Sequence, residues 1–299
     1  MASGLTLRDV PGIRIGHATD GEGLTGCTVV LCTAGAVAGV DVRGSAPGTL
    51  GTDALRPTGV VERIHAVCLA GGSAFGMAAV SGVMRWLAER EIGFPTGIRP
   101  VPIVPAAIIF DLGVGSPTAI PTPEMGYAAC EAAERGDEPL EGRIGAGTGA
   151  TVGKLGGQDG VPGGVGSAAV QVPAGWLVGA LAVVNAVGNV VGRDGRLLAG
   201  NEVLDPGRSS DVGFGNTTLA VVATNAPLDR AECRKMAELG HDALALAISP
   251  VHTLFDGDTV FALSTAAPGA TGLSVPDRVS LGMTAVEVLR RAIERAVPR

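Results

Sequence analysis

The stretch "GFGNTTLAVVATNAPLD", residues 213–229, is the clearest strand signal in the chain. Five of the six residues at 219–224 are apolar, and turn-forming segments bound them on both sides. This pattern is typical of a β-strand that is buried on both faces. Two hydroxyls, Thr217 and Thr218, stand at its start. They are either ordinary strand residues with high β-propensity or part of a reactive centre.

The 299 residues could form one large domain or two small ones, and we expect a single domain over residues 1–299 with an aliphatic core. Hydrophobic residues make up 46% of the chain but aromatic residues only 3%, so Ala, Val, Leu and Ile must fill that core. The formal net charge is -7, and Lys and Arg are scattered along the sequence. No basic face of the kind that nucleic acid or an anionic membrane requires is expected, so neither is predicted as a partner.

Signals for export, disulfides and metal binding are weak. The first residues, "MASGLTLRDVPGIRIGH", lack the apolar core of a signal peptide, and "WLVGALAVVNAVG" is too short to span a bilayer. We therefore expect a cytoplasmic protein whose five cysteines are reduced core residues. His252 with Asp256 and Asp258 is the only local cluster of metal-ligating types, which is a poor basis for a metal site. No metal is predicted.

Strands and helices come in groups rather than in strict alternation, which favours an α+β fold with mostly antiparallel sheets over a doubly wound parallel sheet. A capping box, Asp229 with Glu232, opens one of the helices. Residues 193–216 are polar and read as a long surface loop that ends at Thr217. The predicted helices cover 73–90, about 124–134, 229–247 and 277–297. The predicted strands are "CTVVLC", "VAGVDV", "IHAVCLA", "GSAAVQV", "WLVGALAVVNAV", "TLAVVAT" and "TVFALS".

Two glycine-rich motifs resemble known site loops but differ in detail. In "GAGTGATVGK" (145–154), Thr148 replaces the first glycine of a phosphate-binding loop, and Leu155 stands where a magnesium-binding hydroxyl belongs. In "GGSAFG" (71–76), Phe75 replaces a glycine that a nucleophile elbow requires. Ser73 is better interpreted as the N-cap of the helix that follows. We therefore expect no nucleotide or other cofactor.

Thr217 would gain its own base if the chain were cut before it. A threonine hydroxyl is a weak nucleophile without a base, and a free α-amine with a pKa of about 7.7–8.0 can serve at neutral pH. Asn216 tolerates left-handed backbone, and Gly213 and Gly215 add freedom before the bond. A strained peptide against the hydroxyl could undergo an N-to-O acyl shift followed by hydrolysis.

Seven blocks in order resemble the DmpA-type N-terminal-nucleophile (Ntn) hydrolases, which include L-aminopeptidase/D-esterases, β-peptidyl aminopeptidases and nylon-oligomer hydrolases. The blocks are "VPGIRIGHATD", "AGGSAFGMAAVSGVMRWL", "PIVPAAIIFDL", "GTGATVGKLGG", "VVNAVGNVV", "GNTTLAVVATNAPL" and "TLFDGDTVFALST". The resemblance implies a four-layer αββα sandwich, the Ntn-hydrolase-like fold of DmpA and ornithine acetyltransferase. It also implies self-cleavage between Asn216 and Thr217 into residues 1–216 and 217–299, and assembly as a homotetramer or larger homo-oligomer.

The resemblance also implies roles for individual residues. Thr217 would be the nucleophile, with its freed amine as the base, and Asn185 would donate a hydrogen bond to the oxyanion. Lys154 matches a lysine of the nylon-oligomer branch and would lower the pKa of the amine. Asp256 and Asp258 match the acidic pair of that branch and would orient the amine and hydroxyl. The alternatives are a satisfied strand residue for Asn185, a solvated loop residue for Lys154 and a simple turn for the two acids.

The implied function is hydrolysis of amide bonds in short peptides, amino-acid amides or ω-amino-acid oligomers through an acyl-enzyme on Thr217. One departure is Phe110, which stands where the aminopeptidases carry a tyrosine that contributes to the site. Two alternatives remain open. One is acyl transfer to an amine, as in ornithine acetyltransferase, and the other is an uncleaved, non-catalytic scaffold.

Overall fold

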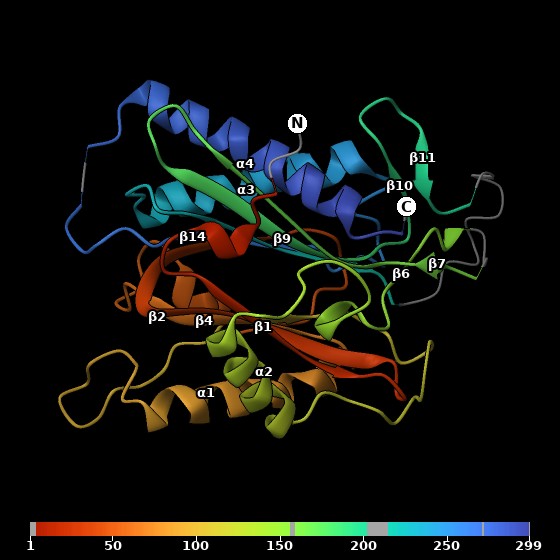
Figure 1. The fold of residues 1–299 in the computed structure, drawn as a ribbon, viewed down its shortest axis with the longest axis horizontal. Helices are drawn as coiled ribbons and strands as arrows, with labels where there is room; N and C mark the ends of the chain where they lie inside the picture. Colours follow the sequence, from red (N-terminus) through yellow and green to blue (C-terminus); the bar gives the residue numbers. More distant parts are fainter. Residues whose placement is uncertain (1–3, 156–158, 202–214, 271, 299) are drawn as a thin grey trace.

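Four layers build the molecule, as the computed structural model shows for residues 4–155, 159–201, 215–270 and 272–298 (Figure 1). Helices α3 (Arg230–Ala247) and α4 (Val275–Arg295) cover one side, and α1 (Ala79–Glu89) and α2 (Pro123–Arg135) cover the other. Two layers of β-strands lie between the helix pairs. The predicted αββα sandwich is therefore confirmed.

Nine strands of the described residues form one hydrogen-bonded sheet. Eight of them follow the path β3-β5-β4-β2-β14-β12-β9-β8, and β1 pairs with β2 off this path. Only the β4–β5 and β12–β14 pairs in this path are parallel, so the mostly antiparallel prediction is confirmed. The strands are β1 (Arg14–Asp20), β2 (Thr25–Val42), β3 (Thr49–Leu50), β4 (Ile64–Ala70), β5 (Ala106–Ile108), β8 (Gly164–Gln171), β9 (Leu177–Asn185), β12 (Thr217–Thr224) and β14 (Thr259–Ser264). Short strands complete the set: β6 (Thr151–Val152), β7 (Val161–Pro162), β10 (Asn189–Val191), β11 (Leu197–Ala199) and β13 (Ile248–Ser249).

Strand β2 passes from one sheet layer into the other. Its first half pairs with β1 and β4, and its second half pairs with β14. The register breaks between Leu31 and Ala36, where Gly35 has a φ of 81° that other residues rarely adopt. The two runs predicted as separate strands, "CTVVLC" and "VAGVDV", are therefore the two halves of one bent strand.

Three apolar cores hold the layers together. Along β12 the side chains alternate, so Leu219 and Val221 enter the core between the sheets. Ala220 and Val222 enter the core under α3 and α4 instead. Every residue of β12 is buried, as predicted for a strand with two covered faces. All five cysteines are buried free thiols in these cores, which confirms their reading as core residues.

The helix ends follow local side-chain chemistry. The predicted capping box of α3 is present: the Asp229 side chain accepts from the Glu232 N–H, and Glu232 accepts from the Asp229 N–H. The prediction that Ser73 caps a helix is wrong. A 3-10 helix covers Ser73–Ala78 before α1 begins, and Gly72 stands at its N-cap. Ser73 has a left-handed φ of 54°, not the extended backbone that a capping serine needs.

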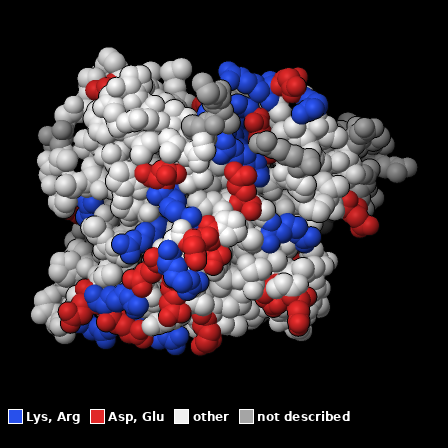
Figure 2. All heavy atoms as spheres, viewed as in Figure 1, with Lys and Arg blue, Asp and Glu red and all other residues white. Residues whose placement is uncertain are grey.

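Charges of both signs lie side by side on the face in Figure 2, most densely over the layer of α1 and α2. Within the described residues, no helix has the length and apolar character needed to cross a membrane. The predicted loop at 193–216 contains β11, and its residues 202–214 lie outside the described residues.

Candidate active site

The segment that opens β12 lies between two neighbouring strands. Thr217 pairs with Asn185 at the end of β9, and Asn216 forms a parallel bridge with Asp256 just before β14. Alternation along β12 places Thr217 on the same face as Leu219, which is the face between the two sheets. Thr217 and Asn216 are only 3% and 4% exposed. The predicted nucleophile and cleavage site are therefore held inside the molecule.

The Thr217 hydroxyl lies directly against the peptide bond that precedes it. The Thr217 Oγ1 contacts the carbonyl oxygen of Asn216. The same carbonyl accepts the N–H of Gly257 at 3.1 Å. A donor in this position would stabilise negative charge that develops on the Asn216 oxygen.

Gly257 lies against this peptide bond, a position that the sequence analysis did not predict. A Cβ at this residue would lie 3.0 Å from Thr217 Oγ1 and 2.5 Å from the carbonyl oxygen of Ala46. Only glycine therefore lets the backbone approach the hydroxyl so closely. The signal available in the sequence was the glycine between the two predicted acids in "FDGDTV".

The side-chain amide of Asn185 connects the elements around this bond. Its Nδ2 donates to the carbonyl oxygens of Gly215 at 2.9 Å and Phe110 at 3.1 Å. Its Oδ1 accepts from the Thr151 N–H at 2.9 Å and from Lys154 Nζ at 3.0 Å. Asn185 is thus a fully satisfied buried amide in the continuous chain, and one of its acceptors lies two residues before Thr217.

Lys154 joins the same cluster. Its Nζ contacts Asn185 Oδ1, the Asn185 carbonyl oxygen at 3.3 Å and the Gly215 carbonyl oxygen at 3.1 Å. Three acceptors suit the three N–H groups of an ammonium. Burial opposes the charge and lowers the pKa of Lys154 to about 7, although the nearby Asp256 favours the charged form. Lys154 can therefore gain or lose a proton near neutral pH.

This lysine predicts a pH-dependent difference in stability. Unfolding returns the pKa of Lys154 from about 7 to 10.5, so between these values the unfolded chain binds more protons. Burial of Lys154 therefore opposes folding fully below pH 7 and progressively less as the pH rises toward 10. We expect the stability of Lys154→Met, relative to its parent, to be higher at pH 6 than at pH 9. Urea unfolding of both proteins in a Thr217→Ala background measures this, and a difference independent of pH would contradict it.

The two predicted acids are buried and accept backbone N–H groups. Asp258 is buried, and its Oδ1 accepts the Thr218 N–H at 2.6 Å. Burial raises the pKa of Asp258, while its hydrogen bonds oppose that rise. Asp256 is also buried, and its Oδ2 accepts the Thr253 N–H at 2.8 Å. Asp258 thus holds the backbone directly after Thr217, whereas the Asp256 side chain holds the loop before β14 and only its backbone bridges Asn216.

Phe110 lies beside the cleavage segment. Its carbonyl oxygen bonds Asn185, and its ring packs so closely against Gly215 that a Cβ there would be 2.9 Å from Cδ1. The next residue, Asp111, is a buried carboxyl that accepts from Thr25 Oγ1 at 2.8 Å and the Gly72 N–H at 2.6 Å. The departure noted in the sequence therefore lies at the site itself.

The weak metal cluster does not assemble. His252 Nδ1 lies 2.7 Å from Asp258 Oδ2, while Asp256 turns to the backbone of Thr253. Over the ranges that the structure describes, no three or more His, Cys, Asp or Glu side chains are arranged to hold a metal ion.

Comparisons with known proteins identify the family of this chain. The family model for peptidase family S58 matches residues 6–299. An uncharacterized aminopeptidase of Mycobacterium leprae is 42% identical over 98% of this chain and 90% of its own length. A 6-aminohexanoate-oligomer endohydrolase of Kocuria is 33% identical over 97% of this chain and 86% of its own length.

A solved structure shares the fold. The L-aminopeptidase D-Ala-esterase/amidase of Ochrobactrum anthropi, described as a variant of the Ntn hydrolase fold, has a TM-score of 0.75 at 18% identity. The match covers 97% of this chain and 85% of that one. The fold and the family match confirm the resemblance to the DmpA-type hydrolases. The chain is therefore a hydrolase that belongs to peptidase family S58.

Proposed function

We propose that this hydrolase cuts its own chain between Asn216 and Thr217 and then uses Thr217 as an N-terminal nucleophile. Its substrates would be amide bonds in short peptides, amino-acid amides or ω-amino-acid oligomers. The observation that carries the proposal is the contact of Thr217 Oγ1 with the Asn216 carbonyl, whose oxygen also accepts the Gly257 N–H.

Self-cleavage would proceed through an ester. Thr217 Oγ1 attacks the carbonyl carbon of Asn216, and the Gly257 N–H stabilises the resulting oxyanion. The C–N bond then breaks, the Thr217 nitrogen takes up the proton that its hydroxyl gave up, and an ester links the two residues. Water hydrolyses that ester to a carboxylate on Asn216 and a free hydroxyl on Thr217. Lys154 bonds the Gly215 carbonyl, and its lowered pKa lets it exchange a proton at neutral pH.

Turnover would use the same residues in new roles. The freed amine of Thr217 accepts the hydroxyl proton as Oγ1 attacks the substrate carbonyl. In the continuous chain Asn185 Nδ2 donates to the Gly215 carbonyl oxygen. After cleavage the same N–H group would donate to the substrate oxyanion instead. Expulsion of the amine product leaves an acyl-enzyme, which water hydrolyses. In its charged form Lys154 would keep the pKa of the amine low and the amine free.

Two observations bear on which class of amide the enzyme would hydrolyse. The relatives include proteins named as aminopeptidases and as 6-aminohexanoate-oligomer endohydrolases, which supports short amides of both kinds. Phe110 brings a ring without a hydroxyl to the site, which argues against simple transfer of β-peptide specificity. Assays with p-nitroanilides of L-, D- and β-amino acids and with nylon oligomers would rank the classes. An added amine acceptor would show whether the acyl group goes to an amine instead of water.

The test of self-cleavage is a denaturing gel of the purified protein. We expect two bands, and N-terminal sequencing of the smaller fragment should read Thr-Thr-Leu-Ala. A single full-length band from a preparation with full turnover would contradict the proposal, because Thr217 would then have no free amine. A single band without turnover would favour the scaffold alternative.

Self-association is part of the proposal. Helix α4 exposes Val275, Val279 and Met283, which lie four residues apart and so form one stripe along the helix. An exposed apolar stripe of this kind is typical of a contact surface. It supports self-association, whereas the expected size, a homotetramer or larger, rests on the resemblance to the family.

A further inference from the structure

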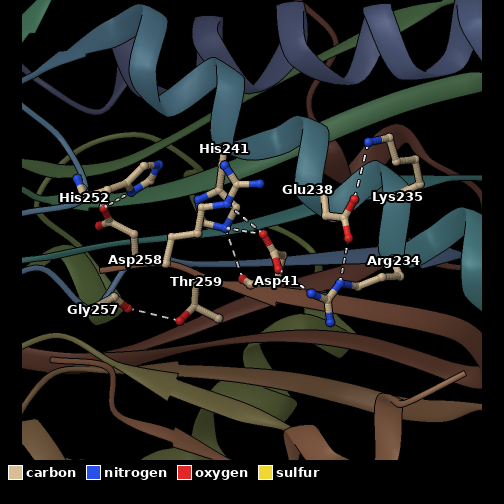
Figure 3. A network of polar contacts seen from close by, with 10 residues as sticks. Asp41, Arg234, Lys235, Glu238, His241, His252, Gly257, Asp258 and Thr259 are labelled. Atoms are coloured by element: carbon tan, nitrogen blue, oxygen red, sulfur yellow. Dashed lines mark hydrogen bonds and ion pairs between the residues drawn. The ribbon is translucent and has the colours of Figure 1, made fainter. Parts of the chain in front are cut away.

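A buried polar network lies on the helix side of the strands that carry the site. Asp258 precedes β14, and alternation places it on the same face as Val260, in the core under α3 and α4. Thr217 faces the other way. Figure 3 shows His252 and His241 side by side between the carboxylates of Asp258 and Asp41. The network therefore lies on the opposite face of the strand from the Thr217 side chain and contacts this segment through the backbone N–H of Thr218.

His252 gives two donors to one carboxylate oxygen. Its ring Nδ1 lies 2.7 Å from Asp258 Oδ2, and its backbone N–H is 3.3 Å from the same oxygen. The residue has a φ of 56°, in the left-handed region that most residues avoid. This backbone conformation lets the ring and the backbone N–H of His252 both reach Asp258 Oδ2. The other oxygen of Asp258 holds the Thr218 N–H at 2.6 Å.

His241, on α3, closes the network from the helix layer. The two imidazole rings are 4.9 Å apart at an angle of 66°. His241 Nε2 lies 3.1 Å from the Asp41 carbonyl oxygen, and burial lowers the pKa of His241 to about 4. His241 is therefore neutral at pH 7 and donates through Nε2. His252 Nε2 and His241 Nδ1 are buried and have no hydrogen-bond partner among the described residues.

We propose that His252 is a positioning residue for the reaction proposed above, because it holds the Asp258 carboxylate against the Thr218 N–H and so fixes the place of Thr217. Thr218 follows the nucleophile directly, so a shift of its N–H would move Thr217 Oγ1 relative to the Gly257 N–H. A displacement of about 1 Å can lower the reaction rate on the order of 100-fold. The proposal depends on the proposed function of Thr217.

Charged groups on every side make the network sensitive to pH. Burial raises the pKa of Asp258, and the nearby charge of Asp256 raises it further. His252 opposes both effects through its hydrogen bond. Beyond His241, the Asp41 carboxylate pairs with Arg43 at 2.9 Å and with Arg234 at 2.7 Å. Both arginines pair with Asp41 and not with Asp258. On the helix side, the side chain that donates to Asp258 is therefore His252.

The test compares His252→Gly with His252→Asn. Both residues tolerate a left-handed backbone, so neither adds strain, but only asparagine can place an N–H donor near the position of Nδ1. We expect His252→Gly to lower kcat roughly 10- to 100-fold with little change in KM, which corresponds to loss of one hydrogen bond to a charged group. The acid limb of its kcat–pH profile should move upward by about one pH unit. His252→Asn should restore most of the kcat and return the acid limb of the profile most of the way to its wild-type position.

Turnover is measured per mole of Thr217 N-terminus, so that slower self-cleavage is not mistaken for slower catalysis. Thermal unfolding of each variant shows whether the fold is retained. If both variants lose activity equally with an unshifted pH profile, or if the glycine variant matches the wild type, the positioning role is wrong. A wild type with neither cleavage nor turnover would instead refute the proposed function, and this inference with it.

Discussion

Thr217→Ala should remain one unbroken polypeptide and should lose turnover on any amide substrate by about 10⁴-fold or more. The alanine removes the oxygen that contacts the Asn216 carbonyl, so no ester forms and no free amine appears. Cleavage and turnover are lost together because both need the same atom. The measurements are a denaturing gel after prolonged incubation and a hydrolysis assay on the same sample.

Thr217→Ser is the matched control. Serine keeps the hydroxyl and removes only a methyl group, so both cleavage and hydrolysis should continue. Thr218→Ala tests the neighbouring hydroxyl, which is buried, points toward the helices and has no hydrogen-bond partner within the part of the chain that the structure describes. It should leave both reactions intact. Turnover that survives in Thr217→Ala would overturn the assignment of the nucleophile.

Asn185→Asp should lower kcat by about 10²–10³-fold, the usual cost of losing one oxyanion donor. The substitution keeps the size of the side chain and its acceptor oxygen, which receives Thr151 N–H and Lys154 Nζ. It removes the N–H₂ group that donates to the carbonyl oxygens of Gly215 and Phe110. Since the lost interaction is strongest in the transition state, KM should change much less than kcat.

Asn225→Asp provides the comparison. Asn225 also accepts a backbone N–H through its Oδ1, from Leu177 at 2.7 Å, but at the far end of β9 from Asn185. Loss of its amide group should leave kcat unchanged. If the two variants have the same kcat, Asn185 is a structural strand residue and the oxyanion donor must be sought elsewhere.

The features that could be predicted from the sequence are those set by short local patterns. The buried strand β12 follows from an unbroken apolar run, and the start of α3 follows from Asp229 and Glu232 three residues apart. The continuity of β2 was missed, because its bend at Gly35 looks like the end of one strand and the start of another. Ser73 was misread because its backbone is set by a turn through Gly72.

Other parts of the site depend on contacts that no local pattern encodes. The Gly257 N–H is a backbone group, so its approach to Asn216 is visible only once β12 and β14 are paired. His241 and His252 looked like dispersed histidines, yet the packing of α3 over β14 places their rings 4.9 Å apart. Residue identity indicated which groups had the right chemistry, and tertiary packing decided which of them meet.

The position of β12 between β9 and β14 has a consequence for a nicked protein. A cut before Thr217 would leave β12 and β14 on one polypeptide and β9 and β2 on the other, hydrogen-bonded in one sheet. The two pieces would stay interleaved without a covalent link, since separating them would tear the central sheet. Folding of the intact chain is a first-order event, whereas reassembly from denatured halves would be second-order, so scission would make the mature form hard to rebuild once lost.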